Sequence, residues 1–223
     1  MKFINRIFSI LLRDYKISIR SFNELFTNLL FFFLSIFIFI FAIGSNNEIL
    51  NAAGIGILWS LLILSSTLSI KKFYQNDFET GNLVIMHMSG ISYEFISLIK
   101  IFSHVLFIQL PFLISLPIAS LMINLSFEKI IFFLVSFSIG SLILSCIGSI
   151  SASMNLLNKT GYSLGGLIVM LFSIPVIIFS IGLINTEDNF FSILYILIGI
   201  FLIFLSIAPW ATAYCIRLAL ENK

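Results

Sequence analysis

Long apolar runs separated by short polar segments make up most of the chain. The runs that exceed about 18 residues cover 25–43, 50–70, 101–123, 130–152, 162–184 and 190–213. Because the hydrocarbon core of a bilayer is about 30 Å thick, a helix needs about 20 apolar residues to cross it. We therefore predict an all-α integral membrane protein with six transmembrane helices.

The segment before the first run has a different pattern. Apolar residues at positions 4, 7, 8, 11 and 12 follow the spacing of a helix with one apolar side, and five Lys or Arg residues lie among residues 1–24. Such a segment is typical of an amphipathic helix in the membrane interface, so we assign 1–24 to a cytoplasmic interfacial helix. The alternative is a basic flank that only fixes orientation. Arg13 and Asp14 interrupt the apolar stretch, so we expect the segment to be retained rather than cleaved as a signal peptide.

Composition narrows the class of protein further. Of the 223 residues, 60% are hydrophobic and 10% are charged, whereas soluble domains carry about 25% charged residues. This excludes a cytosolic enzyme, a nucleic-acid binder and a disulfide scaffold. Six spans leave too few residues for a separate soluble domain. We expect a transmembrane domain at 25–213, preceded by the interfacial segment and followed by a cytoplasmic tail at 214–223.

The positions of the basic residues predict the orientation. Of the 12 Lys and Arg residues, only Lys129 falls on the side of the predicted bundle opposite the two termini. Basic residues close to helix ends remain in the cytoplasm. Both termini are therefore expected to be cytoplasmic, in a multi-pass topology.

The apolar cores of the six runs contain no Asp, Glu, Lys or Arg. A proton- or sodium-driven carrier is expected to bury a carboxylate, so this pattern argues against secondary transport. The chain also has no phosphate-binding Gly-x-x-x-x-Gly-Lys-Ser/Thr motif and no clustered metal ligands. We expect no catalytic or metal site, and a driving force from another subunit. His104 is expected to play a polar role in span three by hydrogen-bonding to a neighbouring helix.

The polar connection at 71–100 is the long internal loop on the predicted cytoplasmic side. Thr80 or Asn82 can start a short helix over residues 83–88, and Gly90 can end it. A short amphipathic helix with exposed Met and Ile is suited to a groove on a partner protein. The alternative is an interfacial linker helix that touches only lipid.

The fourth run carries serines at four-residue spacing, which places them on one ridge of a helix. They are Ser141, Ser145, Ser149 and Ser153. Small residues on one ridge allow close helix packing in lipid. We favour packing within the chain over a sliding or dimer contact.

Several segments resemble one known family. They include LLRDYKISIRS, GILWSLLILSSTLSIKKFYQNDFETGNLVIM, LIKIFSHVLFIQLPFLISLPIASLM, GSLILSCIGSISASM, SIPVIIFSIG and APWATAYCIRLAL, of which DFETGNL and APWATA are the most specific. Together they are similar to cytochrome c maturation protein B, the membrane subunit of the bacterial haem exporter in the ABC-2 class of ABC transporters. The resemblance covers nearly the whole chain.

The resemblance implies partners, a substrate and a location. It implies a separate ABC ATPase subunit, other cytochrome c maturation membrane proteins, a homodimer within the complex, and the bacterial inner membrane. Haem is implied as the substrate of the complex in haem export or haem-chaperone release, and no bound cofactor is expected. The loop after the second span would couple to the ATPase through Asp77, Glu79, Gly81, Leu83 and Met86.

Two other functions stay open from the sequence. The chain could be an autonomous carrier or channel for a small solute, or an assembly subunit without a translocation path. ABC-2 subunits often place re-entrant helices between spans five and six, where this chain has only a short connection. Whether all of 162–213 crosses the membrane is therefore also open.

Overall fold

The computed structural model describes residues 2–20, 22–44, 47–70, 73–157, 164–185 and 189–222, which are helical apart from short turns and contain no strand. The first helices are α1 (Lys2–Arg20), α2 (Phe22–Ile43), α3 (Asn47–Ile70), α4 (Gln75–Glu79), α5 (Asn82–Met88) and α6 (Tyr93–His104). They are followed by the π-helical segment η1 (Val105–Gln109) and by α7 (Leu110–Met122), α8 (Phe127–Asn155), α9 (Leu164–Asn185) and α10 (Phe190–Glu221).

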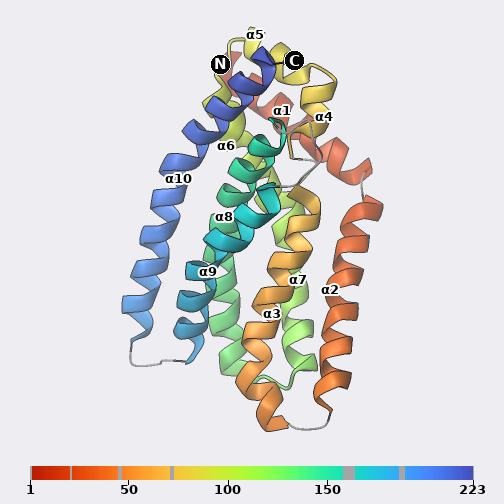
Figure 1. Cartoon of the computed structure of the whole chain (residues 1–223), viewed down its shortest axis with the longest axis vertical. Coiled ribbons are helices and arrows are strands. Elements are labelled where there is room, and N and C mark those ends of the chain that lie inside the picture. The colour runs from red at the N-terminus through yellow and green to blue at the C-terminus, as the bar shows by residue number, and fades with distance from the viewer. Residues whose placement is uncertain are drawn as a thin grey trace.

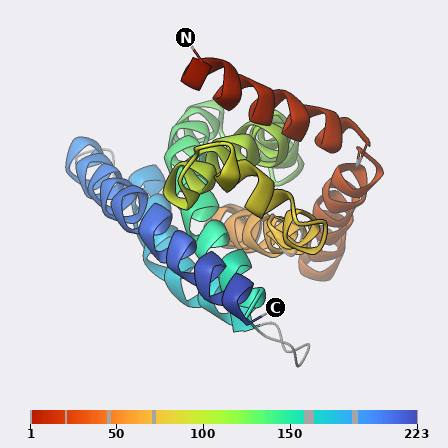
Figure 2. The same ribbon diagram turned by 90° about the horizontal axis from the view of Figure 1, so that it is seen from above.

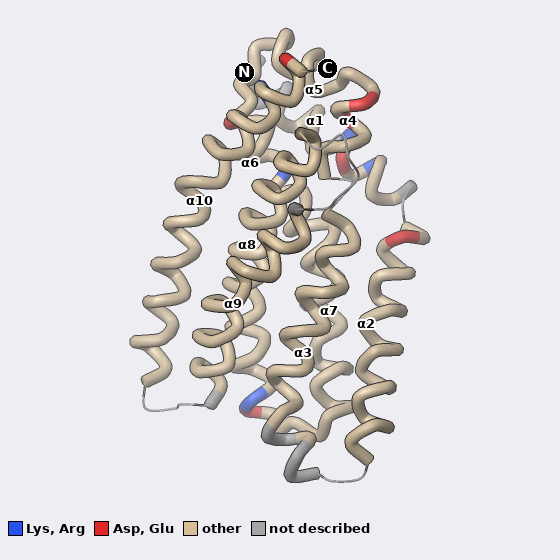
Figure 3. The backbone as a smooth tube through the Cα atoms, in the orientation of Figure 1, with Lys and Arg blue, Asp and Glu red and all other residues tan. Residues whose placement is uncertain are grey.

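Six of these helical stretches are long and apolar enough to cross a membrane, among the residues that the structure describes. They run roughly side by side, and both termini lie at the same end as α4 and α5 (Figure 1). Charged residues gather at this end, and the described residues in the middle of the bundle include none (Figure 3). The other end has a basic and acidic pair in the first turn of α8, Glu128 and Lys129. The six-span prediction is confirmed.

Helix α8 occupies the centre of the bundle. It contacts α3, α6, α7, α9 and α10, and its second half from Gly140 onward is almost continuously buried. Small side chains at this part of α8 allow neighbouring helices to approach closely. The central position explains why α8 has no single apolar face.

The third span differs from its predicted range of 101–123. It begins eight residues earlier, at Tyr93, and consists of α6, η1 and α7 in one continuous run. Pro111 lacks a backbone N–H and would clash with the carbonyl four residues before it in a regular α-helix. The π-helical turn ends at Gln109, two residues before this proline, as expected where a helix absorbs such a clash.

The fifth and sixth spans are both continuous helices. Pro175 lies inside α9 and Pro209 inside α10, and neither ends its helix. Both helices are long enough to cross a membrane. Helix α10 continues to Glu221, so most of the segment predicted as a tail at 214–223 is the last part of the sixth helix.

Helix α1 lies across the ends of the spanning helices rather than alongside them (Figure 2). The apolar residues of α1 do not all lie on one side of the helix. Ile10 and Asp14 are buried against the bundle, whereas Phe8, Leu12 and Tyr15 are exposed. The exposed residues form an apolar stripe on the outer side of α1, which is the pattern of a helix in a membrane interface.

Candidate functional site: the α4–α5 elbow and the adjacent polar cavity

Two short helices in the loop at 71–100 form an elbow at the end of the bundle that holds both termini. Gly81 separates α4 from α5 with φ of 74°, and Gly90 follows α5 with φ of 88°. Glycine adopts this left-handed conformation without the steric cost of a side chain. The predicted helix over residues 83–88 is confirmed as α5, which begins at Asn82.

The five residues expected to couple to an ATPase divide by exposure. Glu79 is exposed and Gly81 is partly exposed, whereas Asp77, Leu83 and Met86 are buried in the chain. The three buried side chains therefore pack inside the chain, and Glu79 and Gly81 are the two of the five at its surface. That these five residues couple to an ATPase stays a prediction.

The outer face of α5 is formed by other apolar residues. Val84, Ile85 and Met88 are exposed, and Met88 retains 81% of its accessible surface. The sequence pattern placed all of these side chains on one helix, but it did not separate the inner from the outer face. We call Val84, Ile85 and Met88 the α5 patch.

Asp77 belongs to a cluster of charges that joins three helices. Lys100 Nζ of α6 lies 2.6 Å from Asp77 Oδ2 and 3.0 Å from Asp14 Oδ1 of α1. Arg13 of α1 is paired with Asp77 and lies 3.8 Å from Asp14. Lys100 and both carboxylates are at least nine-tenths buried. We call Arg13, Asp14, Asp77 and Lys100 the ion cluster; its formal charges cancel.

A second network connects the same loop to the spans. The hydroxyl of Tyr74 lies 2.8 Å from Ser149 Oγ of α8 and donates to Ser97 Oγ of α6 at 3.4 Å. Ser149 Oγ also lies 3.1 Å from Thr212 Oγ1 of α10. All four residues are buried. One tyrosine therefore links the elbow to three transmembrane helices, and we call this set the Tyr74 network.

The four serines of α8 are buried inside the chain. Ser141 and Ser153 donate to carbonyls of their own helix, those of Ser138 and Ile150. Ser149 belongs to the Tyr74 network, and Ser145 Oγ lies 2.9 Å from His104 Nδ1. Ser153 also has a side-chain hydrogen bond with Cys215 of α10, so three of the four serines bond to other helices.

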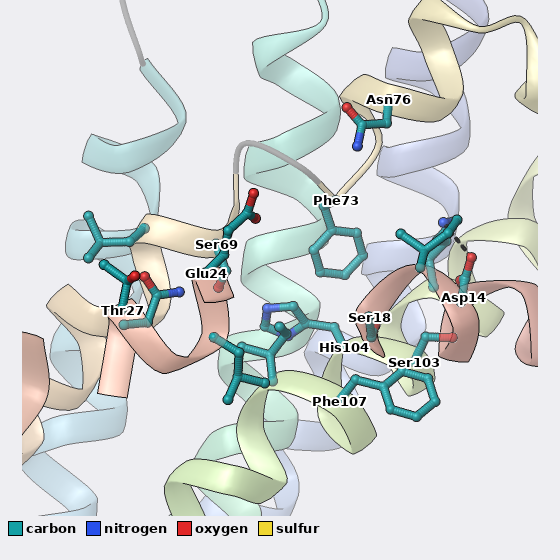
Figure 4. A pocket seen from close by; sticks show the side chains of 16 residues that line it. Asp14, Ser18, Glu24, Thr27, Ser69, Phe73, Asn76, Ser103, His104 and Phe107 are labelled. Atoms are coloured by element: carbon teal, nitrogen blue, oxygen red, sulfur yellow. Dashed lines mark hydrogen bonds and ion pairs between the residues drawn. The ribbon is translucent and has the colours of Figure 1, made fainter. Parts of the chain in front are cut away.

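His104 lies where α6 meets η1, beside a cavity of about 380 Å³. The cavity is lined by the ends of α1, α2 and α3, the start of α4, and the third span. In Figure 4 the ring of His104 projects from the third span beneath the ring of Phe73 and away from Ser103. It stacks on Phe73 with 4.7 Å between ring centroids. No local sequence pattern indicates this cavity, because its walls come from segments far apart in the chain.

No group of three or more His, Cys, Asp or Glu residues that could hold a metal ion occurs in the described part of the chain. Cys146 and Cys215 are both free thiols in spanning helices. What the described residues of the site offer is charge pairing and hydrogen bonding.

The fold and this site define a class: a six-span helical membrane protein with a helix across one end and a structured elbow between spans two and three. Comparison with known proteins then gives the family. Residues 5–219 match the model of the CcmB protein family, and the chain belongs to that family.

Individual relatives are similar over nearly their whole length. Heme exporter protein B of Haemophilus influenzae is 30% identical over 217 residues, which is 96% of this chain and 98% of the relative. Heme exporter protein B of Rhodobacter capsulatus is 28% identical, over 96% of this chain and 99% of the relative. The corresponding protein of Paracoccus denitrificans is 27% identical, again over 96% and 99%.

Proposed function

We propose that this chain is the membrane subunit of an ATP-driven complex that exports haem or releases a haem chaperone in c-type cytochrome biogenesis. The observation that carries the proposal is membership of the CcmB family over residues 5–219, supported by relatives named heme exporter protein B. In this assignment haem is a substrate of the complex. The chain itself performs no catalysis.

The energy comes from a separate ATPase subunit that docks on the elbow. The chain has no phosphate-binding loop of its own. The α5 patch presents apolar side chains beyond the charged end of the bundle, and such a short helix fits an apolar groove on a partner. Glu79 is exposed at the last position of α4, in the same elbow, and a charged residue near the contact favours one orientation of docking.

Movement of the elbow reaches the spans through buried contacts. The ion cluster ties α4 to α1 and α6, and the Tyr74 network ties the residue before α4 to α6, α8 and α10. Coupling requires packed or hydrogen-bonded elements between the two sites. In this proposal Asp77, Leu83 and Met86 keep the elbow rigid so that a push on α5 moves the third span.

The complex lies in the bacterial inner membrane with both termini in the cytoplasm. The support is the placement of Lys and Arg at the end that holds α1, α4 and α5. Two copies of the chain and other cytochrome c maturation membrane proteins complete the assembly, as the family resemblance implies.

The test is capture of the ATPase subunit by affinity-tagged chain from its native membrane, with ATP hydrolysis measured in the captured material. Met88→Asp places a charge in the α5 patch and is expected to reduce the captured ATPase activity at least tenfold. Phe127→Asp is the matched control, because Phe127 is 76% exposed at the opposite end of the bundle.

The proposal fails if Met88→Asp captures as much ATPase as the control. It also fails if c-type cytochromes receive normal amounts of covalently bound haem after the ATPase subunit is deleted. The second result would favour an autonomous carrier or an assembly subunit.

A further inference from the structure

The ring of Tyr93 contacts two other helices at the end of the bundle that holds the elbow. Tyr93 is the first residue of α6 and is 7% exposed. The imidazole of His87, in the last turn of α5, stacks on this ring with 4.2 Å between the centroids and 16° between the planes. Cζ of Arg217 in α10 lies 5.9 Å from the centroid of the same ring. One buried ring therefore contacts both the helix that carries the α5 patch and the last part of the sixth span.

An ion pair reinforces the contact between α6 and α10. Arg217 is paired with Glu94, which follows Tyr93 in the first turn of α6. A guanidinium within about 6 Å of a ring centroid is attracted to the face of the ring, and a charge-assisted bond to a carboxylate fixes its direction. The first turn of α6 thus holds Arg217 through two adjacent side chains.

The contact between α5 and α6 is also made at two points. His87 Nδ1 lies 3.1 Å from the carbonyl oxygen of Ile91 and donates to it, because a carbonyl can only accept. This bond closes the turn at Gly90, where the backbone φ of 88° redirects the chain from α5 into α6. Ile91 is buried. The stacked ring and the closed turn make the end of α5 and the start of α6 one unit.

The part of α10 that carries Arg217 is packed against the bundle by small and branched residues. Ala213, Ile216 and Ala219 are buried, and α10 contacts both α6 and α8. Energetic coupling between two sites is carried by such contiguous packed and hydrogen-bonded elements. The Tyr74 network starts before α4, whereas the contacts of Tyr93 start at α5 itself.

We infer that His87, Tyr93, Glu94 and Arg217, which we call the Tyr93 joint, pass movement of α5 to the sixth span. The inference rests on the proposed function, because it requires a partner that moves α5. A displacement of α5 carries the ring of His87 with it, and the first turn of α6 then pulls or pushes Arg217 and the end of α10. The four residues are positioning residues. They make the third and sixth spans move together at this end of the bundle.

The ion pair of the joint can be removed without removing the fold. The side chain of Arg217 retains 52% of its accessible surface, and ion pairs exposed to this degree contribute little to stability. Substitution of Arg217 is therefore expected to leave both the folded chain and the α5 patch intact. Docking of the ATPase and transmission of its movement can then be measured separately.

The test measures two quantities at equal amounts of the chain: the ATPase activity captured from the native membrane, and the rate of covalent haem attachment to c-type cytochromes in the same cells. Arg217→Leu is expected to capture normal ATPase activity but to lower the rate of haem attachment about threefold, which is the size of effect expected of a coupling residue. Lys16→Leu is the matched control, because it removes an exposed cation from α1. It should change neither quantity.

Two rescue experiments separate transmission from a general structural defect. Tyr93→Phe keeps the ring between His87 and Arg217 and should keep the normal rate of haem attachment, whereas Tyr93→Leu removes the ring and should lower the rate. Glu94→Arg should lower the rate because it places two cations together. Adding Arg217→Glu forms the pair again with the charges exchanged and should restore at least half of the lost rate, whereas two independent defects would add.

The outcomes distinguish this inference from the proposed function. Normal capture with normal haem attachment in Arg217→Leu and Tyr93→Leu would overturn the inference alone. Capture that falls in proportion to haem attachment would also overturn it, because the residues would then only hold α5 for docking. Failure of the unmodified chain to capture any ATPase would overturn the proposed function and the inference with it. If Tyr93→Leu does not accumulate, the charge exchange between Glu94 and Arg217 still decides.

Discussion

The ammonium of Lys100 in α6 lies 2.6 Å from the carboxylate of Asp77 in α4. The two residues belong to different parts of the polar loop, and both are buried. Their contact turns a loop that looks solvent-exposed in the sequence into a rigid connection between the elbow and the third span.

We expect the ion cluster to stabilise the folded chain. Lys100→Met removes the cation between two buried carboxylates, and breaking such a pair costs about 3–5 kcal/mol. We expect a loss of about 3 kcal/mol, because Arg13 still neutralises one carboxylate. Denaturant unfolding of the detergent-solubilised chain measures it. Lys16→Met, an exposed cation on α1, is the control and should be nearly neutral.

A double-mutant cycle separates the contribution of the Asp77–Lys100 contact to stability from the other effects of each substitution. Adding Asp77→Asn to Lys100→Met removes one of the uncompensated charges, so the double variant should be more stable than the sum of the two single losses predicts. Strict additivity of the two losses would show that the contact between Asp77 and Lys100 does not contribute.

Ser149 should matter more than the other serines of α8. Ser149→Ala removes the nearer of the two partners of the buried Tyr74 hydroxyl and the contact with Thr212, and a lost hydrogen bond of this kind costs about 1 kcal/mol or more. Ser141→Ala is the control, because Ser141 bonds to a carbonyl of its own helix. Ser149→Ala should lower both the midpoint temperature of thermal unfolding and the amount of cytochrome c matured in an ATPase-dependent way. Equal effects of the two substitutions would argue against the Tyr74 network as a link.

Gly140 permits the close approach of α8 to Trp59 of α3. A Cβ at this position would overlap the six-membered ring of Trp59, which is fully buried. Gly140→Ala is therefore expected to destabilise the chain by about 1–3 kcal/mol through overpacking. Gly199→Ala in α10 meets nothing within 4 Å and should be neutral or stabilising by up to about 1 kcal/mol. Unfolding curves of both variants test this contrast.

The orientation can be checked by cysteine labelling. In a background with Cys146→Ala and Cys215→Ala, Ser126→Cys reports on the end of the bundle opposite the termini, and Glu221→Cys reports on the end of α10. Both positions are exposed. A membrane-impermeant maleimide should label Ser126→Cys in spheroplasts but label Glu221→Cys only after permeabilisation. The reverse pattern would contradict the orientation predicted from the basic residues.

Much of the fold could be predicted because the signals are local. Six apolar runs of spanning length gave the six helices, and the turn residues Gly81 and Gly90 bracketed α5. The boundaries of the third and sixth spans were less accurate. Polar residues such as Lys100 and Arg217 suggested an end to the membrane helix, but helices α6 and α10 continue through them, because Lys and Arg are themselves good helix formers. In the structure they are paired with Asp77 and Glu94.

The composition of the candidate site was only partly accessible from the sequence. The pattern identified Asp77, His104 and the α8 serines as noteworthy residues. It missed Arg13, Asp14, Lys100 and Tyr74 as their partners, because the contacts join positions 64, 86 and 75 residues apart. No periodicity of a single helix encodes such contacts.

The sequence by itself determined six apolar transmembrane helices, the asymmetric placement of the basic residues and the family to which the chain belongs. These features depend on the hydrophobicity, charge and order of residues along the chain, because each segment enters the lipid according to its own composition. Only the tertiary structure decided which side of α5 faces outward, which charges neutralise one another and which residues His104 contacts. The physical reason is that spanning a membrane depends on one segment at a time, whereas pairing and cavities arise when distant helices pack together.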